Sequence, residues 1–208
     1  MLTRYQNTVM KKTSVFGILL FLLFTSKAQQ AQFGVKGGVN VAQLHYNDNQ
    51  ISSDSKVGVN LGVFAHIPAS KTWALQPELL YSMEGAQKVG NAGTDYHLNY
   101  LNVPLLLQYM FENGFRLEGG PQIGFLLNAK TKSGSVTVDN NGFKSTSFSI
   151  PLGVGYLSSA GVGFYARYVF GLSNIYDPES PIIQSNVFQL GLFYQFTDTK
   201  IHRHRAKR

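Results

Sequence analysis

The sequence predicts an all-β protein, an eight-stranded antiparallel up-and-down transmembrane β-barrel. Three observations lead to this fold class. The chain after its first segment has a period of two residues and no sustained helical period. Its connections alternate between long polar loops and short turns, which is typical of membrane barrels. Charged residues make up only 14% of the chain, against about a quarter in soluble domains.

The first 28 residues are predicted to be a secretory signal peptide outside the fold. Lys11 and Lys12 precede the apolar run VFGILLFLLF, and Ser26 and Ala28 place small side chains before a cleavage point at Gln29. This run is shorter than the roughly 20 residues of a membrane-spanning helix, and an uncleaved anchor is the alternative. The expected organisation is therefore 1–28 signal peptide, 29–196 barrel domain and 197–208 basic periplasmic tail.

The net charge of +7 does not predict a nucleic-acid surface. The signal peptide and the tail TDTKIHRHRAKR hold most of the excess of lysine and arginine, so the barrel region is nearly neutral. The absence of cysteine is compatible with export.

Eight segments have the composition and alternation of strands. Each is about as long as the ten residues with which a tilted strand crosses a bilayer. The segments are Phe33–Leu44, Val57–Ile67, Trp73–Glu84, Tyr96–Phe111, Phe115–Leu127, Ser147–Tyr156, Val162–Gly171 and Val187–Phe196.

The connections between these segments predict an orientation. Long polar loops such as HYNDNQISSDSK and LSNIYDPESPIIQSN alternate with short turns such as PASKT and ENG. Up-and-down barrels of the bacterial outer membrane have their short turns on the periplasmic side. We therefore expect an integral outer-membrane protein with both mature termini in the periplasm.

The two faces of the predicted strands differ in composition. One face is apolar along every strand, as in Val57, Val59, Leu61 and Val63, and carries no charged side chain. The opposite face carries glycines, serines and amides, together with six charged residues: Lys36, Glu78, Glu84, Arg116, Glu118 and Arg167.

Alternation alone would also fit a soluble, lipocalin-like barrel with an apolar interior. The polar face is poor in charge and rich in glycine, which favours a narrow polar lumen over a water-exposed exterior. The interior of an eight-stranded barrel is just wide enough for side chains. We therefore expect the three basic and three acidic residues to pair in a structural ion network. A narrow ion or proton path, or a small ligand site, is the alternative.

Four prolines interrupt the predicted strands at a similar distance from the short turns: Pro77, Pro104, Pro121 and Pro151. Because proline cannot donate a ladder hydrogen bond, bulges or broken pairing are expected there. Aromatic residues near strand ends, such as Trp73, Tyr109, Phe111 and Tyr156, are expected to form girdles at the membrane interface.

Five phrases resemble the PorT-like outer-membrane β-barrel family of Gram-negative bacteria: GVKGGVNVAQL (34–44), QPELLYSMEGAQ (76–87), YLNVPLLLQY (100–109), GGPQIGFLLNAK (119–130) and ARYVFGLSNI (166–175). The resemblance implies an eight-stranded outer-membrane barrel with a cleaved signal. It also implies, as an expectation, a link to type IX protein secretion, in which the name-giving member takes part. Such barrels usually end at a terminal aromatic residue, whereas here a basic tail follows Phe196.

The sequence favours a monomeric, non-enzymatic barrel with a structural, adhesive or transport-auxiliary role. Its expected partners are outer-membrane lipid and lipopolysaccharide, and proteins that contact the long loops, including YDPESP (176–181). A component of type IX-like secretion machinery and a small lipid-modifying enzyme are the alternatives. For catalysis, His97 with loop serines is the only available material.

No cofactor or metal is expected. His202 and His204 are too few for a structural metal site, and GVGFYA (161–166) lies within an alternating strand, where a dinucleotide motif has no helix to open.

Overall fold

The computed structural model describes residues 31–46, 54–89, 94–133, 136–139, 142–176 and 183–196. The predicted signal peptide and basic tail lie outside these residues. The strands are β1 (Gln32–Tyr46), β2 (Asp54–Pro68), β3 (Trp73–Val89), β4 (Thr94–Met110), β5 (Phe115–Gly119), β6 (Gln122–Ser133), β7 (Val136–Asp139), β8 (Thr146–Leu157), β9 (Val162–Gly171) and β10 (Ile183–Gln195).

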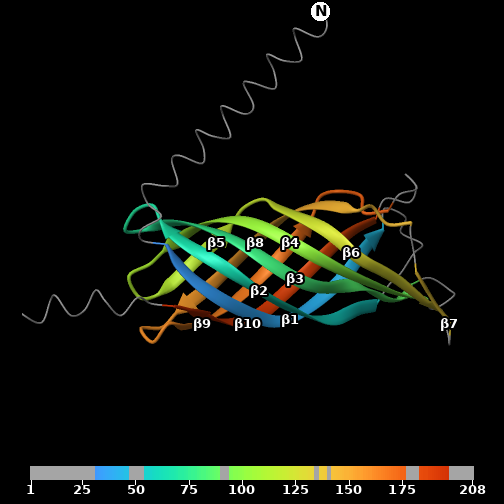
Figure 1. The fold of residues 1–208 in the computed structure, drawn as a ribbon, viewed down its shortest axis with the longest axis horizontal. Coiled ribbons are helices and arrows are strands. Elements are labelled where there is room, and N and C mark those ends of the chain that lie inside the picture. Colours follow the sequence, from blue (N-terminus) through green and yellow to red (C-terminus); the bar gives the residue numbers. More distant parts are fainter. Residues whose placement is uncertain are drawn as a thin grey trace, which may run out of the picture.

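The strands form a closed antiparallel barrel (Figure 1). Neighbouring positions in the ring are occupied by segments that follow one another in the chain, and β1 pairs with β10 to close the ring. β5 and β6 together occupy one place between β4 and β8, because Gly120 and Pro121 interrupt a single long strand without changing its register. β7 pairs with β6 in a hairpin beyond the ring. The predicted fold class and eight-strand ring are confirmed.

The two ends of the barrel differ in the length of their connections. The short turns 69–72, 111–114 and 158–161 lie at one end, here called the short-turn end. The first and last described strands meet at that same end, where the Phe196 amide donates to the Phe33 carbonyl at 2.8 Å. The longer connections lie at the opposite, long-loop end. The described residues contain no helix long and apolar enough to cross a membrane.

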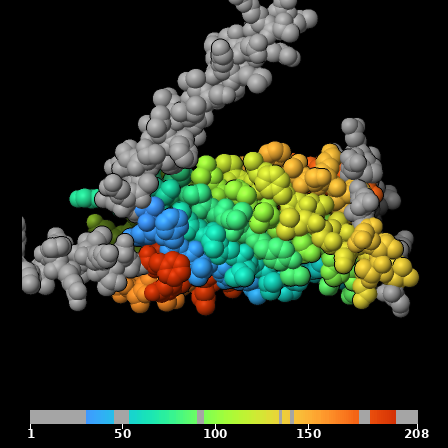
Figure 2. Space-filling view, viewed as in Figure 1, coloured from blue at the N-terminus to red at the C-terminus, as the bar shows by residue number. Residues whose placement is uncertain are grey.

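The predicted apolar face is the outside of the barrel. Large apolar side chains are exposed along every strand of the ring, for example Leu61, Leu117, Leu152 and Leu192. The space-filling view shows the side chains of neighbouring strands packed side by side along the wall (Figure 2). This surface agrees with a lipid-facing wall and rules out the soluble barrel with an apolar face directed inward.

Aromatic side chains gather on the outer face at the short-turn end. Trp73 and Tyr109 pack edge to face with ring centroids 5.0 Å apart, and Tyr109 packs in the same way on Phe111. Phe115 packs against Tyr156 at 5.2 Å. These contacts form an aromatic belt at the short-turn end of the apolar wall. Membrane barrels carry their interfacial aromatic girdles at such positions.

The four prolines interrupt pairing without forming bulges. At Pro77, the β2–β3 ladder lacks its pairs between Phe64 and Ile67 but resumes in the same register. The β3–β4 ladder has a similar gap beside Pro104. The ladders on both sides of Pro121 are also interrupted, one of them opposite Pro151.

The prediction of broken pairing is therefore confirmed at these sites, and the alternative prediction of bulges is wrong. Proline removes one donor toward one neighbouring strand, so the other ladder can continue, as Pro151 does with Val169. The register shifts lie away from the prolines, toward the long-loop end: between Ser55 and Asn60, Ala86 and Val89, and Asn99 and Tyr100.

Candidate functional site

The barrel interior is layered along its axis. Most buried charged side chains lie nearer the short-turn end, amides and hydroxyls lie in the middle together with Glu84, and the long-loop end holds an apolar cluster and the buried Lys56. The alternation of each strand positions them, because every second residue points inward. All six predicted lumen residues are buried: Lys36, Glu78, Glu84, Arg116, Glu118 and Arg167.

Four of these residues form one charged cluster, consisting of Lys36, Glu78, Glu118 and Arg167. The Arg167 guanidinium donates to both carboxyl oxygens of Glu78 at 2.9 and 3.0 Å and to Glu118 Oε1 at 2.6 Å. Lys36 Nζ donates to Glu78 Oε1 at 3.1 Å. Two positive and two negative charges therefore neutralise one another inside the barrel, across strands β1, β3, β5 and β9.

An aromatic ring supports the charged cluster. Lys36 Nζ lies 4.0 Å from the centroid of the Tyr165 ring, and the Arg167 guanidinium lies 5.5 Å from it. The Tyr165 hydroxyl donates to Asn60 Oδ1 at 2.6 Å, and the Asn60 amide donates to Asn40. The charged layer is thus joined to the amide layer above it by direct contacts.

Arg116 lies outside the charged cluster, although it is on the same strand as Glu118. Its guanidinium lies 5.4 Å from the Phe193 ring centroid, and its buried Nε has no hydrogen-bond partner. The space enclosed beside it is about 10 Å³, which is close to the volume needed for one water molecule.

Glu84 is also separate from the cluster. Its carboxylate accepts hydrogen bonds from Ser82 at 3.0 Å, Asn102 at 3.1 Å and Ser185 at 2.9 Å. Within the part of the chain that the structure describes, no lysine or arginine forms a salt bridge with it. The expected pairing of three bases with three acids is therefore wrong for Glu84 and Arg116, because neutral donors and an aromatic ring take the places of the missing partners.

An apolar cluster closes the interior at the long-loop end. We call it the mouth cluster; its buried members are Leu44, Ala86, Leu98, Tyr100, Ala129, Phe143, Ile175 and Ile183. Phe143 packs edge to face on Tyr96 at 5.5 Å and on Tyr176 at 5.6 Å. The sequence reasoning did not predict this cluster. The sequence signal that could have revealed it is the presence of apolar residues, such as Leu98 and Ile183, on the polar face of the strands near the long-loop end.

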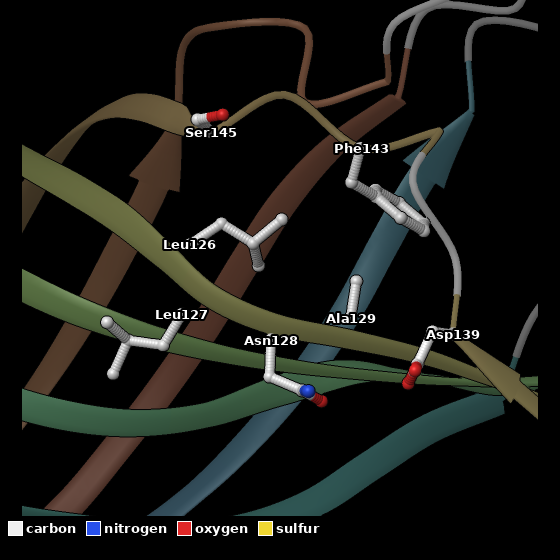
Figure 3. A pocket seen from close by; sticks show the side chains of 7 residues that line it. All are labelled: Leu126, Leu127, Asn128, Ala129, Asp139, Phe143 and Ser145. Atoms are coloured by element: carbon white, nitrogen blue, oxygen red, sulfur yellow. The ribbon is translucent and has the colours of Figure 1, made fainter.

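A cavity of about 460 Å³ lies in the wall beside the mouth cluster. We call it the lateral cavity, and Figure 3 shows the side chains that line it on β6, at the end of β7 and in the segment before β8. They are Leu126, Leu127, Asn128, Ala129, Asp139, Phe143 and Ser145.

The described histidines and acidic residues were compared with the arrangements that a metal or catalytic centre requires. Among residues with a described position, no group of three or more His, Asp or Glu side chains could hold a metal ion. His66 Nδ1 lies 3.0 Å from Gln108 Oε1, which is not a nucleophile. His97, the histidine considered for catalysis, is on β4 in register with Gly85 and Lys130.

Comparisons with known proteins agree with this geometry. The family model described as "Outer membrane protein beta-barrel domain" matches residues 27–177. The comparison with curated proteins gives no match. The structure of Ail, the attachment invasion locus protein of Yersinia pestis, is similar, with a TM-score of 0.54 at 16% identity over 80% of this chain and 99% of Ail. Neisserial surface protein A (NspA) gives a TM-score of 0.57 at 14% identity, over 80% of this chain and 99% of its own.

At these identities the two structures establish the fold alone, whereas the family model covers most of the chain. The chain belongs to the family of the outer membrane protein beta-barrel domain.

Proposed function

We propose that this protein is a non-conducting, non-enzymatic barrel that anchors its long-loop end at the cell surface for contact with envelope or external partners. The observation that carries the proposal is the charged cluster, in which the side chains of Arg167 and Glu78 are fully buried. A barrel filled in this way offers solutes no route along its axis. Its available contact surfaces are the outer wall and the long-loop end.

An adhesive role is compatible with the fold. Ail, which has a similar barrel, is described as an attachment invasion locus protein. The likeness extends to the fold only. We therefore propose lipid, lipopolysaccharide or a surface protein as the partner at the long-loop end.

Conductance across a planar lipid bilayer tests the filled lumen. The purified protein is expected to give no current above that of the bare bilayer. Replacing Lys36, Glu78 and Arg167 together by alanine is expected to open a water-filled path and raise the current. The exposed Lys88→Ala variant is the control, and heat-modifiable gel mobility verifies that each variant is folded. A steady current through the unaltered protein would refute the proposal.

The proposed orientation has a separate test, because the chain contains no cysteine. Lys88 lies at the long-loop end of β3, and Lys71 lies in the short turn before it; both are exposed. A membrane-impermeant maleimide should label Lys88→Cys on intact cells and Lys71→Cys only after the outer membrane is permeabilised. The reverse pattern would place the termini outside.

The PorT-like resemblance supports a role in secretion as the second candidate. Five sequence phrases carry it, and they fall on β1, β3, β4, β5–β6 and β9. Co-purification with proteins of a type IX secretion system from native membranes is the expected result for this candidate. Isolation as a monomer without such proteins would favour the surface role.

A further inference from the structure

An apolar groove lies in the outer wall of the barrel near the short-turn end, where β1, β2 and β3 are neighbours. Its volume is about 420 Å³, and its lining surface is almost entirely apolar. We call it the wall groove. Its lining includes six outward-facing side chains: Phe33, Val63, Ala65, Pro77, Leu79 and Phe196.

The floor of the wall groove lies at the gap in the β2–β3 ladder. This ladder keeps its register across the gap, which places Ala65 opposite Pro77. The short side chains at both positions leave the wall low, whereas Phe33 and Leu79 beside them are 62% and 44% exposed. The wall is therefore hollowed at Ala65 and Pro77 and higher on either side.

The wall groove begins at the border of the apolar wall. Phe33 is the second residue of β1, and Phe196 directly follows β10. The Phe196 amide donates to the Phe33 carbonyl at 2.8 Å, so these two residues mark the short-turn end of the groove. Val63 and Leu79, which are paired with each other, lie farther along the wall. A linear apolar group can therefore lie between these two pairs of residues, with one end at the membrane border.

Positive charge is available at the border end of the groove. The strands β2 and β3, which flank its floor, are joined by the turn 69–72, where Lys71 is exposed and no acidic residue is present. The chain after Phe196 reads TDTKIHRHRAKR, with five lysines and arginines against one aspartate. Lys200 is four residues from Phe196, so chain length alone keeps its Cα within about 14 Å of the Phe196 Cα. Basic residues beside an apolar surface at a membrane border favour an anionic lipid.

We propose that the wall groove binds one acyl chain of an anionic phospholipid, whose phosphate is bound by Lys71 and the basic tail. The occupant is a lipid because the groove belongs to the lipid-facing wall and its lining offers a ligand almost no polar contact. The volume of about 420 Å³ falls within the roughly 300–1,000 Å³ of ligand pockets.

The site selects the charge of the head group and not its shape. Lysine binds phosphate as a point charge, so any phospholipid with a net negative head group satisfies it. Phosphatidylcholine, whose head group is neutral overall, fills the groove with the same acyl chain but gains less from the basic residues. This inference goes beyond the proposed surface role, since it assigns a lipid site to the wall at the opposite end of the barrel.

Tryptophan quenching by brominated lipid tests the proposal. Trp73 is the one tryptophan of the chain, so Trp73→Phe gives a background without tryptophan fluorescence. Phe33→Trp then reports on the groove, and Phe115→Trp, 48% exposed at the start of β5, reports on the wall away from it. Two preparations of mixed phosphatidylcholine and phosphatidylglycerol vesicles carry the same amount of bromine, on the acyl chains of one lipid or of the other.

Bromine on phosphatidylglycerol should quench Phe33→Trp more strongly than bromine on phosphatidylcholine. The expected preference for the anionic lipid is about fivefold, the factor that one basic residue near a charged membrane surface provides. At Phe115→Trp the two preparations should quench equally. If Phe33→Trp does not fold by gel mobility, Leu79→Trp at the inner end of the groove replaces it. Equal quenching by both preparations at the groove position overturns the proposal.

Matched variants in the same background test the two parts of the site separately. Ala65→Leu fills the groove and should abolish the preference, whereas Ala166→Leu, the same change on the outer face of β9, should preserve it. Lys71→Gln combined with Lys200→Gln should lower the preference, whereas Lys88→Gln at the long-loop end should not. A preference that survives Ala65→Leu, or that the control variants lose to the same extent, overturns the proposal.

Discussion

Neutralising Glu78 should lower the free energy of unfolding of the barrel more than neutralising any exposed charge. Its buried carboxylate accepts hydrogen bonds from Lys36 at 3.1 Å, from Arg167 at 2.9 Å and from Gln76 at 2.8 Å. Glu78→Gln leaves the charged cluster with two positive charges and one negative charge in a buried site. Removing one partner of a buried ion pair costs about 3–5 kcal/mol.

Urea unfolding in lipid vesicles, followed by the fluorescence of Trp73, measures this loss. The exposed pair of Lys88 and Asp54, whose side chains are 75% and 60% accessible, is the matched comparison. Lys88→Ala is expected to cost less than about 1 kcal/mol.

A compensated variant separates charge imbalance from loss of packing. Lys36→Met combined with Glu78→Gln leaves Arg167 and Glu118 as a neutral pair, bonded at 2.6 Å. The double variant should therefore be more stable than Glu78→Gln alone. The electrostatic reasoning is refuted if Glu78→Gln costs no more than Lys88→Ala, or if the second substitution only adds to the loss.

Three further predictions concern the wall and the amide layer. A Cβ at Gly38 would lie 2.3 Å from the Leu190 carbonyl oxygen, whereas a Cβ at Gly37 would meet no atom closer than 3.4 Å. Gly38→Ala should therefore lower the free energy of unfolding by about 1–3 kcal/mol. Gly37→Ala should change it little. Tyr165→Phe leaves a buried amide oxygen without its 2.6 Å donor and should cost about 1–3 kcal/mol in the same assay. In hydrogen exchange, the Ala65 amide, beside the β2–β3 gap, should exchange faster than amides of the unbroken β1–β10 ladder.

The sequence could predict which face each strand turns inward, because a period of two leaves only two choices and lipid requires the apolar one outside. Lys36, Glu78 and Arg167 all point inward for this reason. Which of them meet could not be predicted. Arg167 and Glu78 are 89 residues apart, and their contact depends on how the strands are staggered around the ring.

The mouth cluster escaped prediction for a related reason. Leu98 and Tyr100 alternate with polar residues on β4, so the same pattern that sends Leu101 outward assigns them to the polar face. Alternation describes the average composition of a face and not its change along the barrel axis. The lateral cavity depends on the crossing of Phe143 to Tyr176, a long-range contact that local sequence does not contain.

The four prolines lie at neighbouring strand positions of the ring, so the gaps in the hydrogen-bond ladders lie on the arc from β2 to β8. On the opposite arc, the ladders from β8 through β9 and β10 to β1 and β2 run without a gap. Ladder hydrogen bonds hold neighbouring strands together, so we expect the arc with gaps to deform more readily than the arc without them. The lateral cavity lies within the arc with gaps. Membrane thickness and tension are therefore expected to alter the width of that cavity more than the shape of the unbroken arc.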